Sequence, residues 1–116
     1  MNQTVPTTIL IADDDPSHLM LAEAALAGAG FIVHTASDGQ EAVERFPDVK
    51  PDVVVLDVMM PRMTGIDACR EIRRLAGTRF LPILMLTRRN DLLAISAAFA
   101  AGASDFAQMG LNPRLL

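Results

Sequence analysis

Short apolar runs alternate along the chain with longer segments whose apolar residues recur at helical spacing. Between Ile66 and Leu75, every third residue is apolar, as expected for one face of a helix. Pro47 is expected to end the second helical segment, because proline cannot continue a helix. The pattern predicts strands over residues 8–12, 31–35, 52–57, 81–86 and 104–107, and helices over 16–29, 38–46, 64–75 and 91–101.

Strands and helices therefore alternate as repeated βα units. Helices of this length allow right-handed crossovers between parallel strands, so we expect a parallel sheet with helices on both faces. The third and fourth strands are apolar throughout and show no period of two, which is typical of strands buried on both faces. The predicted fold class is α/β.

Polar side chains stand where three of the predicted strands end. The residues are Asp13, Asp14 and Asp15 after the first strand, Asp57 at the end of the third, and Thr87 after the fourth. Ligands of open parallel sheets bind beyond the carboxyl ends of the strands, so these groups mark one candidate site. Clustered carboxylates stay ionised when a cation neutralises them, and such oxygen ligands suit Mg²⁺. Beside that ion, Asp57 could attack phosphorus as a nucleophile and become an aspartyl phosphate.

The same residues also have a purely structural interpretation. Asp15 before Pro16 fits a helix cap followed by the first helical residue. A lone aspartate at a strand end is often a solvated turn residue. The agreement of three strand ends on one edge favours the functional interpretation.

Composition narrows the classes of protein further. The chain has 116 residues, 51% hydrophobic and 21% charged, which fits one globular domain. A formal net charge of -4 argues against nucleic acid or an anionic membrane as a direct partner. The single cysteine excludes an internal disulfide, and His18 and His34 have no partner at a metal-binding spacing. The N-terminus has neither the features of a signal peptide nor the length of a membrane span, and we expect a cytoplasmic protein.

With these residues placed, the chain resembles the receiver domains of bacterial two-component response regulators over nearly its whole length. The resemblance rests on the pair Asp13–Asp14, the segment DVMMPRMTG that begins at Asp57, Thr87 after LPILML, and AGASDF before the last strand. It implies a flavodoxin-like, doubly wound sheet of five parallel strands in the order 2-1-3-4-5, with residues 1–116 forming one receiver domain. It also implies a phosphoacceptor domain and not an enzyme, beyond self-catalysed phosphorylation and dephosphorylation.

The resemblance assigns a role to each residue of the candidate site. Asp57 is expected to accept a phosphoryl group from a histidine kinase or a histidine phosphotransfer protein. The expected ligands of Mg²⁺ are Asp13, Asp14, Asp57 and the backbone carbonyl of Met59. Thr87, through its hydroxyl, and Phe106, as the switch aromatic, are expected to couple phosphorylation to a change of the surface.

One departure from the family bears on this chemistry. Where the family has lysine followed by proline after the switch aromatic, this chain has Met109 and Gly110. Methionine offers neither charge nor donor to the aspartyl phosphate, and losing a charge-assisted contact costs about 1.5–3 kcal/mol. Lys50 lies at the opposite end of the sheet, whereas Arg88 could restore a cation, hinder the phosphodonor or lie in solvent. The alternative interpretation is a pseudo-receiver, a protein-interaction module with weak or no phosphorylation.

Two other classes of protein fit less well. A phosphatase of the haloacid dehalogenase type needs a second acid two residues after its nucleophilic aspartate, where this chain has Met59. A flavin-binding protein of the flavodoxin type needs a phosphate-cradling loop after the first strand, where this chain has three acids.

The chain stops where the resemblance expects a fifth helix. Residues 112–116 begin like a helix, with Asn112 as the cap and Pro113 in the first position, so the fifth helix is expected to be missing or truncated. The apolar face that it covers is expected to favour a homodimer. An output domain could follow residue 116.

Overall fold

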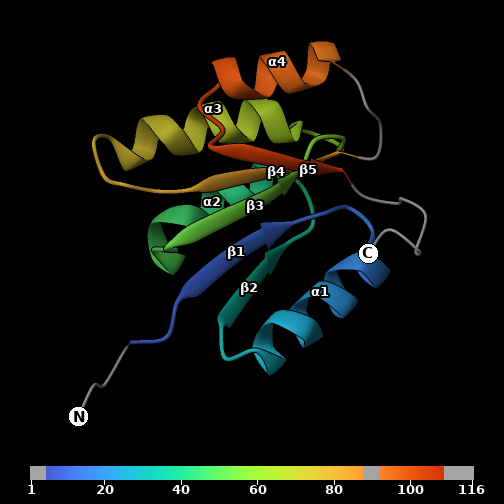
Figure 1. Cartoon of the computed structure of the whole chain (residues 1–116), viewed down its shortest axis with the longest axis vertical. Helices are drawn as coiled ribbons and strands as arrows, with labels where there is room; N and C mark the ends of the chain where they lie inside the picture. The colour runs from blue at the N-terminus through green and yellow to red at the C-terminus, as the bar shows by residue number, and fades with distance from the viewer. Residues whose placement is uncertain (1–4, 88–91, 109–116) are drawn as a thin grey trace.

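The computed structural model of the chain describes residues 5–87 and 92–108. The strands in these residues are β1 (Thr8–Ala12), β2 (Ile32–Ala36), β3 (Val53–Asp57), β4 (Ile83–Thr87) and β5 (Asp105–Gln108), and the helices are α1 (Pro16–Gly28), α2 (Gly39–Val49), α3 (Gly65–Ala76) and α4 (Leu92–Ala100). Neighbouring strands are parallel, in the order β2-β1-β3-β4-β5 (Figure 1). This order confirms the predicted topology.

Helices cover both faces of the sheet, as the apolar strands predicted. On one face α2, α3 and α4 pack over strand residues such as Leu10, Leu56 and Met85. On the other face α1 packs over Ile9 and Val55. Figure 1 shows α1 on the opposite side of the sheet from α3 and α4. Alternate residues of one strand thus face two apolar clusters, which explains why the central strands have no polar positions until they end.

Polar side chains fix where the helices begin. The Asp15 carboxylate accepts a hydrogen bond from the Ser17 N–H at 2.9 Å, and Pro16 occupies the first turn of α1, as predicted. Asp38 and Thr64 cap α2 and α3 in the same way. Each of these helices follows closely on a strand, so its first turn lies beside the carboxyl edge of the sheet.

Several predicted boundaries differ from the structure by one residue, and two differ by two residues or more. Pro47 does not end the second helix but lies inside α2, which continues to Val49. A proline this close to the end costs only one helical hydrogen bond, and Lys50 then ends the helix in a left-handed conformation with φ 51°. The fourth strand begins at Ile83 and not at residue 81, because Pro82 has no N–H to donate to the sheet.

Several sequence-based expectations fall outside the described residues. They concern Arg88, the start of the fourth helix at residue 91, Met109, Gly110 and the segment 112–116. Within the described ranges, no helix is both long enough and apolar enough to span a membrane.

Candidate functional site

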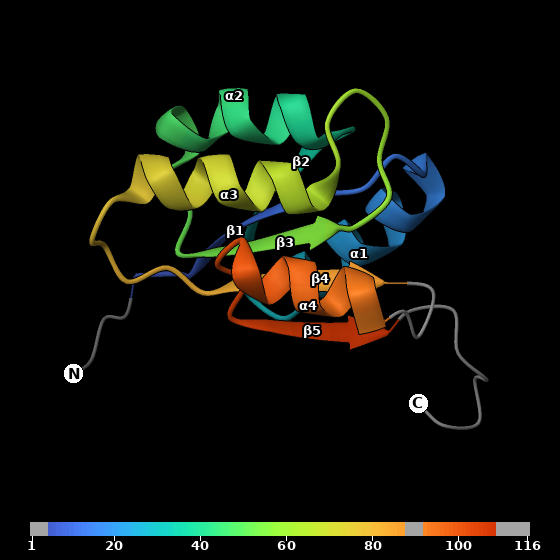
Figure 2. The same cartoon turned by 90° about the horizontal axis from the view of Figure 1, so that it is seen from above.

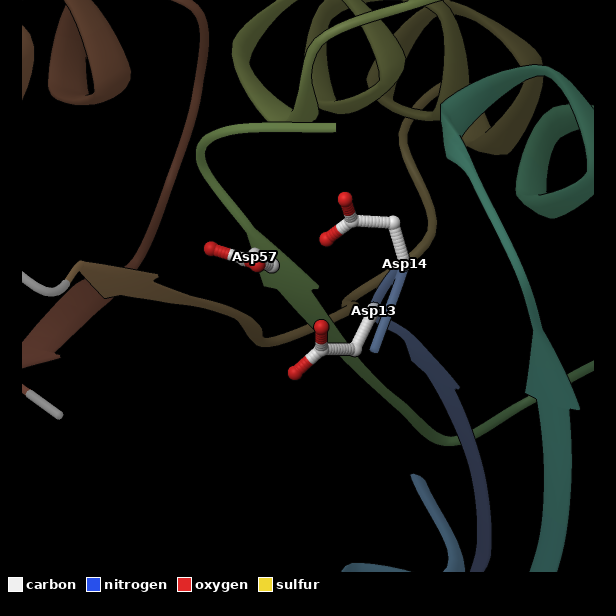
Figure 3. Close-up of side chains that lie close together, drawn as sticks. All are labelled: Asp13, Asp14 and Asp57. Atoms are coloured by element: carbon white, nitrogen blue, oxygen red, sulfur yellow. The ribbon is translucent and has the colours of Figure 1, made fainter. Parts of the chain in front are cut away.

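Three carboxylates meet at the carboxyl edge of the sheet. Asp13 and Asp14 directly follow β1, and Asp57 is the last residue of β3. One carboxylate oxygen from each lies within 4.8 Å of the other two (Figure 3). The pairing of Ala12 with Leu56 brings the ends of β1 and β3 level. The register of these two strands therefore creates the cluster.

Backbone groups hold two of the carboxyl groups in place. The Asp13 carboxylate accepts a hydrogen bond from the Asp15 N–H at 2.9 Å. The Asp13 N–H donates to the carbonyl of Ala36, at the end of β2, at 3.1 Å. The Asp57 carboxylate accepts from the Met59 N–H at 3.4 Å. The cluster is thus tied to β2 and to the loop that follows β3.

Burial makes this cluster unfavourable without a cation. Asp13 and Asp57 are each 2% exposed, whereas Asp14 is exposed. Two unit charges 4.8 Å apart repel by about 3.5 kcal/mol at an effective dielectric constant of roughly 20. Carboxylate oxygens are the hard ligands that Mg²⁺ takes, and the open side at Asp14 leaves room for the waters that this ion keeps. The donor set therefore fits Mg²⁺.

A histidine that was not assigned to the site from the sequence lies against it. Nδ1 of His18 is 3.3 Å from a carboxylate oxygen of Asp13, and Nε2 is 3.4 Å from one of Asp15. The start of α1 sets this arrangement, because Asp15 is the helix cap and His18 lies in the first turn. The spacing of three residues between the cap and the histidine was the available signal in the sequence.

The two residues expected to couple the site to the surface lie on the neighbouring strands. Thr87 ends β4 and is buried, and because Asp57 pairs with Leu86, Thr87 lies one position further toward the same edge. Phe106 lies on β5, and its ring meets that of Phe99 on α4 edge to face, with the ring centroids 5.7 Å apart. Thr87 therefore lies at the edge with the acids, while Phe106 belongs to the packing between β5 and α4.

The loop between β3 and α3 turns back tightly on Asp57. A side chain at Gly65 would clash with the backbone carbonyl of Asp57, and the Gly65 N–H donates to the carbonyl of Val58 at 2.9 Å. Glycine is the residue that permits so close an approach. Met59, whose carbonyl is the fourth expected metal ligand, lies in this loop with an exposed side chain.

An ion pair that was not predicted from the sequence reaches this loop from the start of α2. Arg62 donates to both carboxylate oxygens of Asp38, at 2.8 Å and 3.2 Å. The Arg62 guanidinium holds the pKa of the Asp38 carboxyl below its ordinary value. The two residues are 24 positions apart, so no local spacing rule pairs them.

The chain matches one protein family over most of its length. The family model described as the response regulator receiver domain matches residues 9–114. The matched range contains every residue of the candidate site.

Relatives in sequence include two bacterial regulators. The DNA-binding response regulator MtrA of Mycolicibacterium smegmatis is 36% identical over 113 residues, which are 97% of this chain and 48% of that protein. The alkaline phosphatase synthesis transcriptional regulatory protein PhoP of Bacillus subtilis is 38% identical over 106 residues, which are 91% of this chain and 43% of that protein. This chain spans less than half the length of either relative.

Solved structures agree on the fold. The chemotaxis protein CheY4 of Vibrio cholerae has a TM-score of 0.87 at 33% identity, over 95% of this chain and 92% of that chain. A response regulator receiver domain protein of Clostridium thermocellum has a TM-score of 0.81 at 29% identity, over 93% of this chain and 86% of that chain. Both are similar to this chain over nearly all of its length.

These relatives correct one sequence-based expectation. The net charge of -4 led us to expect no direct nucleic acid partner, yet the Mycolicibacterium smegmatis relative is named a DNA-binding response regulator. The charge of a chain that spans 48% of such a protein describes its own surface and not the rest of the protein. As a statement about proteins of this kind, the expectation was wrong.

Proposed function

The chain belongs to the response regulator receiver domain family, and from this premise we propose that Asp57 is its phosphoacceptor. As a receiver domain it acts in two-component signalling, in which a histidine kinase supplies the phosphoryl group. The observation that carries the assignment to Asp57 is the meeting of its carboxylate with those of Asp13 and Asp14 within 4.8 Å.

The proposed Mg²⁺ site consists of the three carboxylates and the Met59 carbonyl. The burial of Asp13 and Asp57 beside an exposed Asp14 supports a site that is closed on the protein side and open toward solvent. When bound, Mg²⁺ neutralises the acids and offsets the negative charge of the phosphoryl oxygens. The role of Asp13 and Asp14 is to hold the ion where the phosphoryl group of the donor approaches Asp57.

The proposed chemistry is a phosphoryl transfer to a carboxylate. One oxygen of Asp57 attacks phosphorus while the phosphorus–nitrogen bond of a phosphohistidine donor breaks. The electron pair of that bond leaves with the imidazole, and an acyl phosphate forms on Asp57. In hydrolysis, water attacks phosphorus and the carboxylate leaves. Because the attacking carboxylate and the acids that would hold Mg²⁺ belong to this chain, and only the donor or the water comes from outside, we assign it self-catalysed phosphorylation and dephosphorylation.

Thr87 and Phe106 are the proposed route from the site to the surface. The Thr87 hydroxyl is a donor for a phosphoryl oxygen on Asp57, since Thr87 lies at the same edge of the sheet. Phe106 has a partner on α4 in Phe99 and is 37% exposed, so its ring has both a contact to lose and space to move. Phosphorylation is thereby coupled to the α4–β5 surface.

Control of DNA binding is the proposed output of a longer protein that carries this chain. The names of the relatives support it, since one is a DNA-binding response regulator and another a transcriptional regulatory protein. A cytoplasmic location is part of this proposal, because a bacterium keeps its DNA there.

Labelling with acetyl phosphate tests the proposed phosphoacceptor. We expect the chain to gain the mass of one phosphoryl group in the presence of Mg²⁺, and to gain none with a chelator or in an Asp57→Ala variant. Intact-mass measurement and peptide mapping give the stoichiometry and the labelled residue. A label retained by Asp57→Ala contradicts the assignment.

Met109→Lys separates the proposal from the pseudo-receiver alternative. Restoring a charge-assisted contact of about 1.5–3 kcal/mol should speed labelling by about ten- to a hundredfold. A chain that takes no label while its Met109→Lys variant does is a pseudo-receiver. A chain that is labelled as fast as the variant does not depend on a lysine at this position.

A further inference from the structure

The first turn of α2 lies against the loop that carries Met59. Figure 2 shows the loop between β3 and α3 rising toward the start of α2. Arg62 of the loop donates to the Asp38 carboxylate at 2.8 Å and 3.2 Å. The first residue of α2, Gly39, is buried, and a side chain there would clash with the carbonyl of Met63. An ion pair and a close backbone approach therefore join α2 to this loop.

Arg62 has a backbone conformation that other residues adopt more readily. Its φ is 65°, in the left-handed region that glycine and asparagine enter more readily than arginine. A turn with no further role would be better served by either of them. What arginine adds is the pair of hydrogen bonds to Asp38, which also caps α2 by accepting from the Glu41 N–H at 2.8 Å. A non-glycine residue in the left-handed region beside a candidate site points to a role of its side chain there.

The same contacts continue to the acids after β1. Asp38 lies two residues beyond the end of β2, where the Ala36 carbonyl accepts from the Asp13 N–H at 3.1 Å. Two sets of hydrogen bonds, Arg62 to Asp38 and Asp13 to Ala36, are thus joined by the short backbone segment between residues 36 and 38. Together they connect the loop after β3 to the end of β1, the two segments that supply the expected metal ligands.

We propose that Arg62, Asp38 and Gly39 are positioning residues that hold the β3–α3 loop so that the Met59 carbonyl faces the three acids. The inference rests on the proposed function, because it assumes that these groups hold Mg²⁺. The three residues act through the loop and not on the reacting atoms. Their loss therefore lowers the affinity of the site for Mg²⁺ by displacing one of its ligands.

The charge of Arg62 and its contact with the loop predict opposite effects on Mg²⁺ affinity when the side chain is removed. Removing a cation near an acid cluster tightens the binding of another cation, by Coulomb's law. Releasing the loop instead weakens binding, because a ligand is no longer held in place. Residues that orient metal ligands contribute typically about 10–100-fold in affinity. We expect an effect at or below the lower end of this range, because the Arg62 side chain is 60% exposed and its ion pair is screened by water.

The test is the dissociation constant of Mg²⁺ for the whole chain, measured by calorimetry at constant ionic strength. Arg62→Asn keeps a residue that accepts the left-handed backbone and removes the guanidinium. The matched control is Arg70→Gln on α3, which removes a guanidinium that is 59% exposed and 2.8 Å from Asp67. We expect Arg62→Asn to bind about three- to tenfold more weakly, and Arg70→Gln to bind as tightly as the unsubstituted chain or slightly more tightly.

Further variants separate positioning from general stability. Asp38→Asn keeps an acceptor for the helix cap but breaks the ion pair, so it should weaken Mg²⁺ binding in parallel with Arg62→Asn. The double variant should bind no more weakly than the weaker single variant, because both changes remove one contact. Arg62→Lys should recover part of the affinity. Thermal melts of all variants show whether the loss of affinity exceeds any loss of stability.

The outcomes distinguish this inference from the proposed function. Unchanged or tighter Mg²⁺ binding by Arg62→Asn, or additive losses in the double variant, overturns the positioning role and leaves the proposed function standing. Absence of Mg²⁺ binding by the unsubstituted chain overturns both. If Arg62→Asn does not fold, the affinities of Arg62→Lys and Asp38→Asn decide by the same criterion.

Discussion

The two halves of the sheet are built in different ways. The half around β1 and β3 ends in buried acids, and backbone contacts such as that of Gly65 with Asp57 hold its loops close. In the half around β5 and α4, residues 104–107 are exposed. There α4 buries the small side chain of Ala98 and exposes 83% of Leu93.

The contrast indicates that the two halves of the sheet have different roles. A metal and phosphoryl site needs ligands at fixed distances, which close backbone contacts provide. A responding surface needs packing that can be exchanged at low cost, and small or exposed apolar side chains bury little area. We therefore expect changes in the first half to affect both stability and Mg²⁺ binding, and changes in the second half to affect stability alone.

Gly65→Ala should have the largest effect on stability. The added methyl group meets the backbone carbonyl of Asp57, which cannot move away without shifting β3, and we expect a loss of about 3 kcal/mol of unfolding free energy or more. Urea unfolding measures it. The control is Gly28→Ala in α1, where the methyl group meets nothing within 4 Å and should add about 0.5–1 kcal/mol. A Gly65→Ala chain as stable as the original contradicts the tight loop.

Arg73→Ala should have the second largest effect on stability, and it should destabilise the half of the sheet around β5 and α4. The Arg73 guanidinium of α3 donates to the carbonyl of Gly102, after α4, at 2.6 Å and 3.1 Å, and to that of Leu81 at 2.7 Å. Losing hydrogen bonds from a charged donor should cost about 1.5–3 kcal/mol. Hydrogen exchange should quicken in α4 and β5, while Mg²⁺ affinity stays the same.

Arg74→Ala is the control for this change. Arg74 is the next residue of α3, and its ion pair with Glu71 is largely exposed to water, so its loss should lower stability far less than the loss of Arg73 does. Equal effects of the two substitutions would show that Arg73 does not hold the end of α4.

Phe106→Ala should lower stability by about 1 kcal/mol, because it removes an edge-to-face contact with Phe99 at 5.7 Å. Its Mg²⁺ affinity should equal that of the unsubstituted chain. Calorimetry of the variant measures the affinity, and a clear loss would contradict the separation between the two halves.

Asp38→Asn should have the smallest effect on stability, and this effect should depend on pH. The hydrogen bond from Arg62 lowers the pKa of Asp38 from its ordinary value of 3.8. The ionised form therefore stabilises the fold by about 1 kcal/mol or less, fully above the ordinary pKa and progressively less as the pH falls through the lowered pKa. The stability difference between the chain and Asp38→Asn should shrink below about pH 4. A stability difference that grows as the pH falls would contradict this prediction.

Much of the fold could be predicted from the sequence because its signals are local. Apolar runs ending in Asp13 and Asp57 identify buried parallel strands and the edge at which they end. The helix cap at Asp15 could be predicted equally well from the sequence. The two wrong boundaries at prolines are opposite errors: Pro47 was predicted to end a helix that continues to Val49, whereas the predicted fourth strand included Pro82 but begins only after it. A proline removes one hydrogen bond, and the neighbouring residues decide whether the element continues past it.

The contacts that complete the site could not be predicted in the same way. Arg62 and Asp38 are 24 positions apart, and Arg73 and Gly102 are 29 apart. Long flexible side chains reach such partners only once the strand order has placed their segments together. His18 is an intermediate case, since it lies five residues from Asp13 but reaches it only through the turn that Asp15 caps.

An Mg²⁺ titration followed by amide NMR is the most direct test of the central claim, that the three acids form one metal site at the edge of the sheet. We predict weak, saturable binding with shifts concentrated at residues 13–15 and 57–59, abolished when Asp14→Asn and Asp57→Asn are combined. An absence of shifts at these residues, or an unchanged response in the double variant, would contradict the site.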